Sequence, residues 1–332
     1  MVKKIYALLR KLLPGSLKQK ITLLLYKSGI KPRVNKSQAS PLSKALIVFS
    51  ADFEMAWAFR YSKKVKDPVK MGLRERHNFP DILQLFNKHT IPVSWATVGH
   101  LFMESCADSD KHKDMISPAY FENKNWTFSK GDWYDADPGT NVDKDPAWYA
   151  PDLIQSIINS PVKHEMACHT FSHIDFSYKN CTTELAESEI QKCLELAKDK
   201  GVKLKSMVFP GGTEGNFETL KENGFICYRK PMKYDIDVPY TDKYGLIAIP
   251  SSYGLDGNPD TYSAAQYLEL AQSFIQAVVK HKLVCHFWFH PSMNPWYMKN
   301  VLPEIISEVA KLRDNGQVEI LTMNDVAEKF QK

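Results

Sequence analysis

The feature that most constrains the fold of this 332-residue chain is a repeated alternation of short apolar runs with helical patterns. Apolar runs predict strands at 45–49, 92–97, 164–168, 205–209, 225–228, 246–249, 283–289 and 318–321. Helical periodicity predicts helices at 79–89, 183–200, 263–280, 302–313 and 324–331. Apolar strands separated by helices form parallel sheets that are buried on both faces. About eight such strands predict an α/β barrel that is closed or nearly closed. The sequence contains neither a GxGxxG motif after a strand nor a phosphate loop, so it does not indicate a doubly wound sheet.

The composition is typical of a soluble globular protein that can bury a large core, with 44% hydrophobic and 24% charged residues. Six cysteines are scattered through the chain, and none forms a CxxC pair. We therefore expect buried thiols in a reducing compartment in preference to disulfides. The six are Cys106, Cys168, Cys181, Cys193, Cys227 and Cys285.

The net charge of +5 is concentrated at the N-terminus. Residues 1–44 contain eleven Lys or Arg and no Asp or Glu, so the remaining 32 basic and 38 acidic residues give the body a net charge of −6. Such a body is not expected to bind nucleic acid. The basic character belongs to one segment.

Residues 1–34 read as a basic amphipathic segment, with apolar runs too short for the roughly 18 residues that span a bilayer. No signal-peptide cleavage site is evident. The segment either lies on an anionic membrane surface or packs as an arm on the body or on a partner. We expect an arm and linker over 1–43 and a barrel domain over 44–332. The expected location is cytoplasmic, with peripheral contact at the inner membrane face through 1–34.

A long polar and aromatic insert, 103–150, separates the second and third predicted strands. Long connections inside compact domains are often lids or binding loops. Exposed aromatic rings among polar neighbours suit stacking on sugars, whereas buried rings would form only the core of a local flap. Both interpretations stay open for the insert aromatics, Trp126, Trp133, Tyr134, Trp148 and Tyr149.

Two histidines, His169 and His173, stand four residues apart just after the third predicted strand. On a helical turn, residues i and i+4 lie on one face, so both rings would reach one point. Neutral imidazole is a preferred ligand of zinc and of other divalent transition metals. The spacing alone is weak, since either histidine could be a hydrogen-bonded structural residue.

Polar clusters follow three other predicted strands as well. Asp52 and Glu54 follow the first strand, Phe209-Pro-Gly-Gly212 follows the fourth, and His290-Pro291 follows the seventh. Alternation places the two carboxylates on the same side of an extended backbone. Each cluster alone has an ordinary interpretation, such as a helix cap or a turn. Together they predict an active site, because the carboxyl ends of parallel barrel strands meet at one end of the barrel.

This ordered set resembles the polysaccharide deacetylase superfamily, the NodB-type group of carbohydrate esterase family 4. The matching residues are Asp52-x-Glu54, His169-Thr-Phe-Ser-His173, Phe209-Pro-Gly and His290-Pro. The segments 91–99 and 164–173 are similar to family segments as well, and the resemblance covers roughly residues 44–330. It implies a distorted (β/α) barrel of about seven to eight parallel strands.

The resemblance also implies metal-dependent hydrolysis of an acetamide or a related amide. His169 and His173 would ligate the metal, with Glu54 in the third ligand position. Zinc is the expected cofactor, with cobalt or nickel as alternatives. Asp52 would be the general base and His290 the general acid. Substrate contacts are expected from Trp57, Pro210, Gly211 and Trp288.

The sequence departs from the family pattern in the first and third motifs, and the Asp and Trp of the family's fourth motif have no clear counterpart. Glu54 replaces the usual aspartate, so the metal would move by on the order of 1 Å or the longer carboxylate would fold back. The third motif usually supplies an arginine that orients the base, but Gly211 and Gly212 stand there. The candidates to replace it are Arg60, Arg74, Arg76 and Arg229.

The expected function is removal of acetyl groups from an N- or O-acetylated sugar in surface polysaccharide biosynthesis, and the expected partner is this carbohydrate. One alternative is an allantoinase-like hydrolase of a small non-peptide amide. Another is an inactive carbohydrate-binding protein that uses the barrel mouth and the insert. His286 and His100 are secondary site candidates, and Cys285 points away from His286 by alternation. The other histidines are expected to be structural or surface residues, namely His77, His89, His112, His164 and His281.

Overall fold

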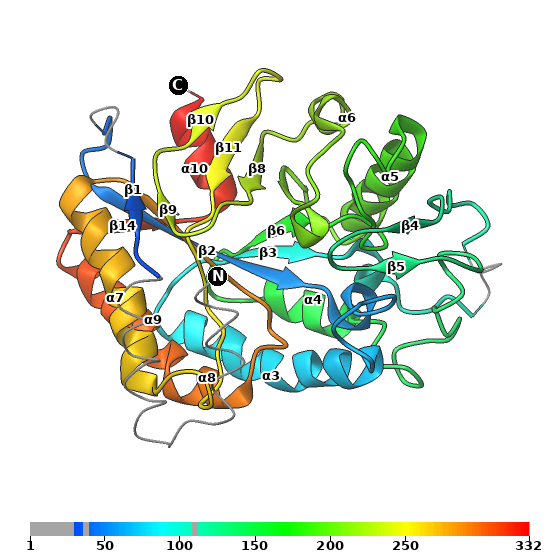
Figure 1. Ribbon diagram of the computed structural model, residues 1–332, viewed down its shortest axis with the longest axis horizontal. Helices are drawn as coiled ribbons and strands as arrows, with labels where there is room; N and C mark the ends of the chain where they lie inside the picture. The colour runs from blue at the N-terminus through cyan, green and yellow to red at the C-terminus, as the bar shows by residue number, and fades with distance from the viewer. Residues whose placement is uncertain (1–29, 36–39, 108–111, 332) are drawn as a thin grey trace, which may run out of the picture.

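The computed structural model describes residues 30–35, 40–107 and 112–331. Its main element is a ten-stranded, mostly parallel sheet in the order β10-β11-β8-β7-β6-β3-β2-β13-β12, with β14 paired to β2 (Figure 1). Its strands are β2 (Ala45–Phe53), β3 (Ser94–Thr97), β6 (Glu165–Cys168), β7 (Ser206–Val208), β8 (Cys227–Lys230), β10 (Tyr240–Thr241), β11 (Ile247–Pro250), β12 (Tyr253–Gly254), β13 (Val284–Phe289) and β14 (Val318–Leu321). All eight predicted strands are therefore present.

The sheet curls so that its two ends approach each other. β11 pairs with β8, and β12, only two residues further along the chain, pairs with β13. The Ser252 backbone N–H donates to the carbonyl of His286 at 2.8 Å, which links the end of β11 to β13. The sequence prediction of a distorted parallel barrel is confirmed.

Alternation along β2 creates two cores. Leu46 and Val48 point to an inner apolar cluster, whereas Ile47 and Phe49 point to the outer cluster beneath the helices. All of these side chains are buried, as expected for a strand with no polar face. The same alternation continues through Ser50 and Asp52, so these polar side chains belong to the inner face, where the barrel opens.

Most helices of the described residues cover the outer face of the sheet. Those of at least six residues are α3 (Pro68–Lys88), α4 (Pro151–Ile158), α5 (Thr183–Asp199), α6 (Phe217–Glu222), α7 (Ala264–His281), α8 (Pro295–Asn300), α9 (Leu302–Asp314) and α10 (Met323–Phe330). Short 3-10 turns are η1 (Met55–Ala58), η2 (Gly99–Phe102) and η3 (Pro210–Gly212). In Figure 1, α7, α9, α8 and α3 follow one another around one side of the sheet.

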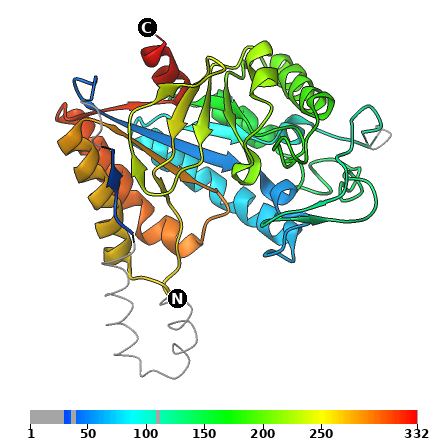
Figure 2. The same cartoon turned by 45° about the horizontal axis from the view of Figure 1, so that its top comes forward.

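The C-terminal helix α10 closes the inner core at one end of the barrel. Its buried residues Met323, Val326 and Ala327 join the inner apolar cluster. Figure 2 shows this helix beside the strands β8, β10 and β11. A capping box at its start, in which Thr322 and Asp325 exchange side-chain and backbone hydrogen bonds, fixes where the helix begins. The opposite end of the barrel is left for the site.

Three elements differ from the sequence predictions. α3 begins at Pro68, eleven residues before the predicted start at 79, because Asp67 caps the Lys70 N–H and proline suits a first helical turn. Part of the expected linker pairs with the body, since β1 (Arg33–Val34) lies parallel to β9 (Asp235–Ile236). The short helices α4, α6 and α8 were not predicted. The predicted arm lies mostly in residues 1–29, outside the described residues.

The insert 103–150 carries a small hairpin, β4 (Phe121–Glu122) with β5 (Thr127–Phe128), and otherwise consists of turns. It lies at the end of the molecule farthest from α7 (Figures 1 and 2). All six cysteines fall in the described part and are buried thiols, as predicted. Within the described residues, no helix combines the length and the apolar character needed to cross a membrane.

Candidate active site

β2 delivers two carboxylates to the open end of the barrel. Asp52 and Glu54 are both buried, and the chain then turns into η1 at Met55, which has a φ of +46°. The backbone N–H of Glu54 donates to Oε1 of Glu75 on α3 at 2.9 Å. Burial and the charge of Glu54 raise the pKa of Glu75 well above its ordinary value, which favours its protonated form. This buried carboxyl anchors the backbone that carries Glu54.

The two histidines lie on a loop after β6, not on the helical turn that their spacing suggested. Thr170 and His173 have φ values of +58° and +56°, which a right-handed helix does not contain. The rings still converge, with their centroids 5.0 Å apart. Nδ1 of His169 lies 2.7 Å from the carbonyl of Val208, so it carries the proton and Nε2 is left with its lone pair.

The loop that carries both histidines, 169–173, is called the histidine loop. It is anchored at Ser172, which contacts both α5 and the insert. Its N–H and hydroxyl both donate to the buried Glu189 of α5, at 2.8 and 2.6 Å. Nε1 of Trp133 donates to the Ser172 hydroxyl at 3.0 Å, and Tyr134 donates to Glu189 at 3.1 Å. The Arg60 guanidinium donates to the Ser172 carbonyl and stacks between Trp57 and Trp133. The loop is therefore rigidly positioned from behind.

Three donor atoms meet at one point in the barrel mouth. Oε2 of Glu54 lies 3.1 Å from Nε2 of His169 and 3.0 Å from Nε2 of His173. Ligands of a tetrahedral metal with bonds near 2.0 Å are separated by about 3.3 Å, so the spacing fits a small divalent ion. Two neutral imidazoles and one carboxylate match the ligand set of catalytic zinc sites. The residues present fit a metal.

Asp52 stands beside this cluster and is held by an arginine from another strand. Nη1 and Nη2 of Arg229, on β8, donate to Oδ1 and Oδ2 of Asp52 at 2.6 and 2.7 Å. Arg229 also donates to the Ser50 hydroxyl at 3.0 Å, and Nε2 of His286 lies 2.8 Å from the same oxygen. Of the four candidate arginines, Arg229 is the one that pairs with Asp52. A planar fork of this kind fixes both position and charge of a carboxylate.

His290 approaches the two carboxylates from the end of β13. Its Nε2 lies 3.3 Å from Oε1 of Glu54 and 3.8 Å from Oδ2 of Asp52. Its side chain is 34% exposed, in contrast to the buried His169 and His173, so it can reach both solvent and a bound molecule. This is the geometry expected of a proton donor at a cavity wall.

Charged neighbours keep the two carboxylates ionised, and burial favours the neutral form of the His173 imidazole. Burial alone would raise the pKa of Asp52, but Arg229 outweighs it and the pKa is lowered. Burial opposes ionisation of Glu54 too, yet His290 and His173 hold the pKa of Glu54 well below its ordinary value. Burial lowers the pKa of His173, which favours the neutral, metal-binding form.

A cavity of about 460 Å³ opens above these groups. Gly211 and Trp288 line it, as expected, and Trp126 of the insert forms another wall beside His173, with ring centroids 5.3 Å apart. Two of the residues expected to contact substrate do not line this cavity. Trp57 is buried, donates to the carbonyl of Trp148 at 3.1 Å and does not line the cavity. Pro210 is buried in η3 and does not line it either.

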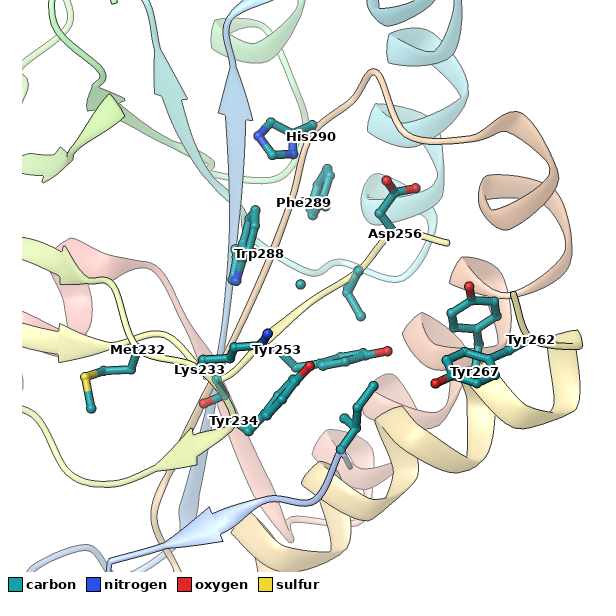
Figure 3. Close-up of a pocket in the computed structure, with 14 residues that line it drawn as sticks. Met232, Lys233, Tyr234, Tyr253, Asp256, Tyr262, Tyr267, Trp288, Phe289 and His290 are labelled. Atoms are coloured by element: carbon teal, nitrogen blue, oxygen red, sulfur yellow. The ribbon is translucent and has the colours of Figure 1, made fainter. Parts of the chain in front are cut away.

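A second, aromatic pocket of about 510 Å³ adjoins the cavity. The two share Met232, Trp288 and His290. Figure 3 shows Trp288 and His290 on one side of this pocket and a group of tyrosines around the rest. These are Tyr234, Tyr253, Tyr262 and Tyr267. The cleft therefore continues from the ligand cluster along an aromatic surface.

The insert aromatics are buried, which corrects the interpretation that they are exposed stacking platforms. Trp133, Tyr134 and Tyr149 are each at most 2% exposed. The insert is a flap whose core holds the histidine loop, and only Trp126 among its tryptophans reaches the cavity. Glu75 was missed by sequence reasoning. The sequence feature that could have identified Glu75 is the position of a carboxylate on the apolar face of α3, four residues before Phe79.

Comparisons with known proteins give similarities at the level of the fold. No family model and no curated protein matches the sequence. A Mycobacterium smegmatis structure, of a protein whose assignment as a polysaccharide deacetylase is itself provisional, aligns over 91% of this chain and 95% of its own. The TM-score is 0.61 at 17% identity. A 4-alpha-glucanotransferase from Thermococcus litoralis aligns over 86% of this chain and 40% of its own, with a TM-score of 0.50 at 14% identity.

The first of these similarities covers nearly the whole of both chains, whereas the second covers less than half of the larger enzyme. The motifs after β2, β6, β7 and β13 independently resemble one superfamily, and the curled parallel sheet places them at one end of the barrel. The chain therefore shares the fold of the Mycobacterium smegmatis structure, and its motifs resemble those of the polysaccharide deacetylase (NodB-type, carbohydrate esterase family 4) superfamily.

Proposed function

We propose that the chain is a metal-dependent deacetylase that hydrolyses the acetyl group of an N- or O-acetylated sugar. The observation that supports this most strongly is the arrangement of five side chains around one cavity. The donor atoms of Glu54, His169 and His173 converge, and an arginine-held Asp52 and a partly exposed His290 stand beside them. A ligand set, a base and an acid around one cavity is what hydrolysis of an acetamide requires.

Glu54, His169 and His173 would hold the metal, and zinc suits this donor set best, with cobalt or nickel as alternatives. Such an ion, when bound, supplies a Lewis acid that polarises an acyl oxygen and acidifies water. The Val208 carbonyl keeps Nε2 of His169 available, and Glu75 holds the backbone of Glu54. These outer contacts orient the ligands before any substrate binds.

The remaining steps are proton transfers by residues of the chain. Asp52, anionic because of Arg229, takes the proton from the attacking water. Nε2 of His290 gives a proton to the leaving nitrogen as the C–N bond breaks, so acetate and an amine are released. With an O-acetylated substrate, the same proton goes to an alkoxide oxygen. Trp126 and Trp288 shield the reacting atoms from bulk water.

A carbohydrate substrate is supported by the aromatic pocket beside the cavity. Tyrosine and tryptophan faces stack on sugar rings, and the pocket extends the cavity past Trp288. The basic segment 1–34 supports a cytoplasmic enzyme that works at the inner face of a membrane. Its substrate there would be a precursor of a surface polysaccharide.

Acetate release from a panel of acetylated sugars and oligosaccharides tests the proposal, and hydrolysis of small ureides such as allantoin is followed in parallel by loss of the ureide. We expect release from at least one sugar, and loss of release in His173→Ala and Asp52→Asn but not in His77→Ala, whose imidazole is exposed on α3. Activity on ureides alone would favour the allantoinase-like alternative. Binding of sugars without any turnover would favour the inactive carbohydrate-binding protein.

A further inference from the structure

A second cluster of metal-ligating side chains lies behind the histidine loop, where the insert joins the barrel. It consists of His100 in η2, Cys106 and His112 at the start of the insert, and Asp137 further along it. All four side chains are buried. Each directs one donor atom to a common point, and these four atoms all lie within 4.8 Å of one another.

The distances between these atoms are short and consistent. Nε2 of His100 lies 3.0 Å from Sγ of Cys106 and 3.1 Å from Oδ2 of Asp137. Nε2 of His112 lies 3.3 Å from the same sulfur and 2.8 Å from the same carboxylate oxygen. Donors around a tetrahedral zinc are separated by about 3.3–3.6 Å, so these four separations would have to lengthen by up to about 0.6 Å when a metal binds.

Hydrogen bonds pair these groups: both imidazole Nε2–H groups can donate to Oδ2 of Asp137, and the Cys106 thiol donates to the Met103 sulfur at 3.9 Å. The same four buried residues also direct two imidazole nitrogens, a sulfur and a carboxylate oxygen to one point, which is the arrangement of a metal site. A divalent cation satisfies all four lone pairs at once. Two neutral imidazoles, one thiolate and one carboxylate also bring a dication to zero net charge, which a buried site requires.

Outer partners hold the ligands in place, as they do in structural metal sites. Oδ1 of Asp137 accepts from the Tyr149 hydroxyl at 3.1 Å and from the Gly139 N–H at 2.9 Å, so Oδ2 is left to face the cluster. Nδ1 of His100 lies 3.3 Å from the carbonyl of Trp148. The N–H of Cys106 donates to the carbonyl of Thr140 at 2.8 Å.

We propose that His100, Cys106, His112 and Asp137 form a second metal site, structural in role, that takes zinc or a similar thiophilic divalent cation. Four protein ligands leave no open position, in contrast to the three-ligand cluster at Glu54. The site fastens the insert to the barrel. It also supports the histidine loop, because Phe171 packs on the rings of His100 and His112 and its carbonyl accepts from the His100 N–H at 2.9 Å.

Elemental analysis and cobalt spectroscopy of the full-length protein test this proposal. We expect about two equivalents of metal per chain in the wild type and about one in Cys106→Ala or His112→Gln. Cobalt-loaded protein should show thiolate-to-cobalt charge-transfer absorption. This signal reports the second site alone, because the cluster at Glu54 contains no sulfur.

The absorption should persist in His173→Ala, which removes only the catalytic ligand, and in Cys227→Ser, a buried thiol elsewhere. It should be absent in Cys106→Ala. If cobalt-loaded wild-type protein lacks the absorption and holds no more than about one equivalent, the four residues are a hydrogen-bonded core cluster and the proposal fails. The absorption and metal content of the wild-type protein test the second site even if the variants do not fold. They also do not depend on whether the cluster at Glu54 is catalytically active.

Discussion

At the scale of single residues, the length of one side chain sets the geometry of the catalytic cluster. Glu54 replaces the aspartate expected from the family resemblance, yet its carboxylate oxygen lies 3.0–3.1 Å from both ligand imidazoles. The backbone at this point is pinned by Glu75 and turns sharply at Met55. The extra methylene therefore matches where this backbone runs, and the family's aspartate would fall short here.

Glu54→Asp should accordingly weaken metal binding at the catalytic cluster. Withdrawing the carboxylate by about one C–C bond of roughly 1.5 Å removes it from the contact distance to His169 and His173. We expect a loss of about 10- to 100-fold in metal affinity, measured by titration of metal-depleted protein. Glu304→Asp, an exposed change in the first turn of α9, is the matched control. Equal affinity in Glu54→Asp and wild type would contradict the claim that the side-chain length at position 54 sets the geometry of the cluster.

Arg229 should tune the base through both charge and geometry. Burial raises the pKa of Asp52 and Arg229 lowers it, so removing the cation in Arg229→Gln should raise that pKa. The deprotonated base then appears at higher pH, and the acid limb of the kcat/KM profile moves upward. Arg229→Lys keeps a cation but loses the bidentate fork, so kcat/KM should fall about 10- to 100-fold with a smaller movement of that limb.

The two substitutions at Arg229 are compared with each other and with wild type across the same pH range. A profile in Arg229→Gln that coincides with the wild-type profile would mean that Asp52 is not the titrating base.

At the scale of elements, sequence patterns predicted what regular periodicity encodes. Apolar runs placed all eight predicted strands, and alternation put Asp52 and Glu54 on one face. The histidine loop was expected as a helical turn, because the spacing of His169 and His173 carries no information on the positive φ values that tertiary contacts impose. Arg229 was one of four candidates, since its pairing spans 177 residues. The insert has no period, so burial of its aromatics was not predictable.

Gly211 should be intolerant of any side chain, because η3 approaches the insert closely. Its φ is +57°, and an added Cβ would lie 2.5 Å from the Trp126 ring. Gly211→Ala should displace Trp126 from the cavity wall and lower kcat/KM. Gly224→Ala is the matched control, with a φ of +81° and no atom within 4 Å of the added Cβ. Because both glycines have a positive φ, either substitution should lower the free energy of unfolding by about 1 kcal/mol. The two variants should therefore be equally stable, and only Gly211→Ala should lose activity.

The basic N-terminal segment is expected to bring the enzyme to an anionic surface. Deleting residues 1–29 removes most of its lysines and arginines, so co-sedimentation with vesicles that contain anionic lipid should fall and the wild-type binding should weaken with salt. Neutral vesicles provide the control. Equal binding of the full chain and the deletion variant would rule out a membrane role for the segment.

At the scale of the whole molecule, one curled sheet arranges the site from distant parts of the chain. β2 brings Asp52 and Glu54, β6 is followed by the two histidines of the loop, β8 brings Arg229 and β13 is followed by His290. Parallel strands place these groups at one end of the barrel, while α10 fills the other with apolar side chains. The flap 103–150 then supports the histidine loop from outside through Ser172 and Phe171. The histidine loop is therefore the segment through which the flap and the barrel together position His169 and His173.

The most direct test of a metal-dependent deacetylase is restoration of acetate release by added metal. Protein depleted of metal should be inactive toward its acetylated sugar, and zinc should restore activity to wild type but not to His173→Ala, which loses a ligand nitrogen 3.0 Å from Glu54. Full acetate release by metal-depleted wild type, or equal restoration of His173→Ala, would contradict the proposed role of the Glu54, His169 and His173 cluster.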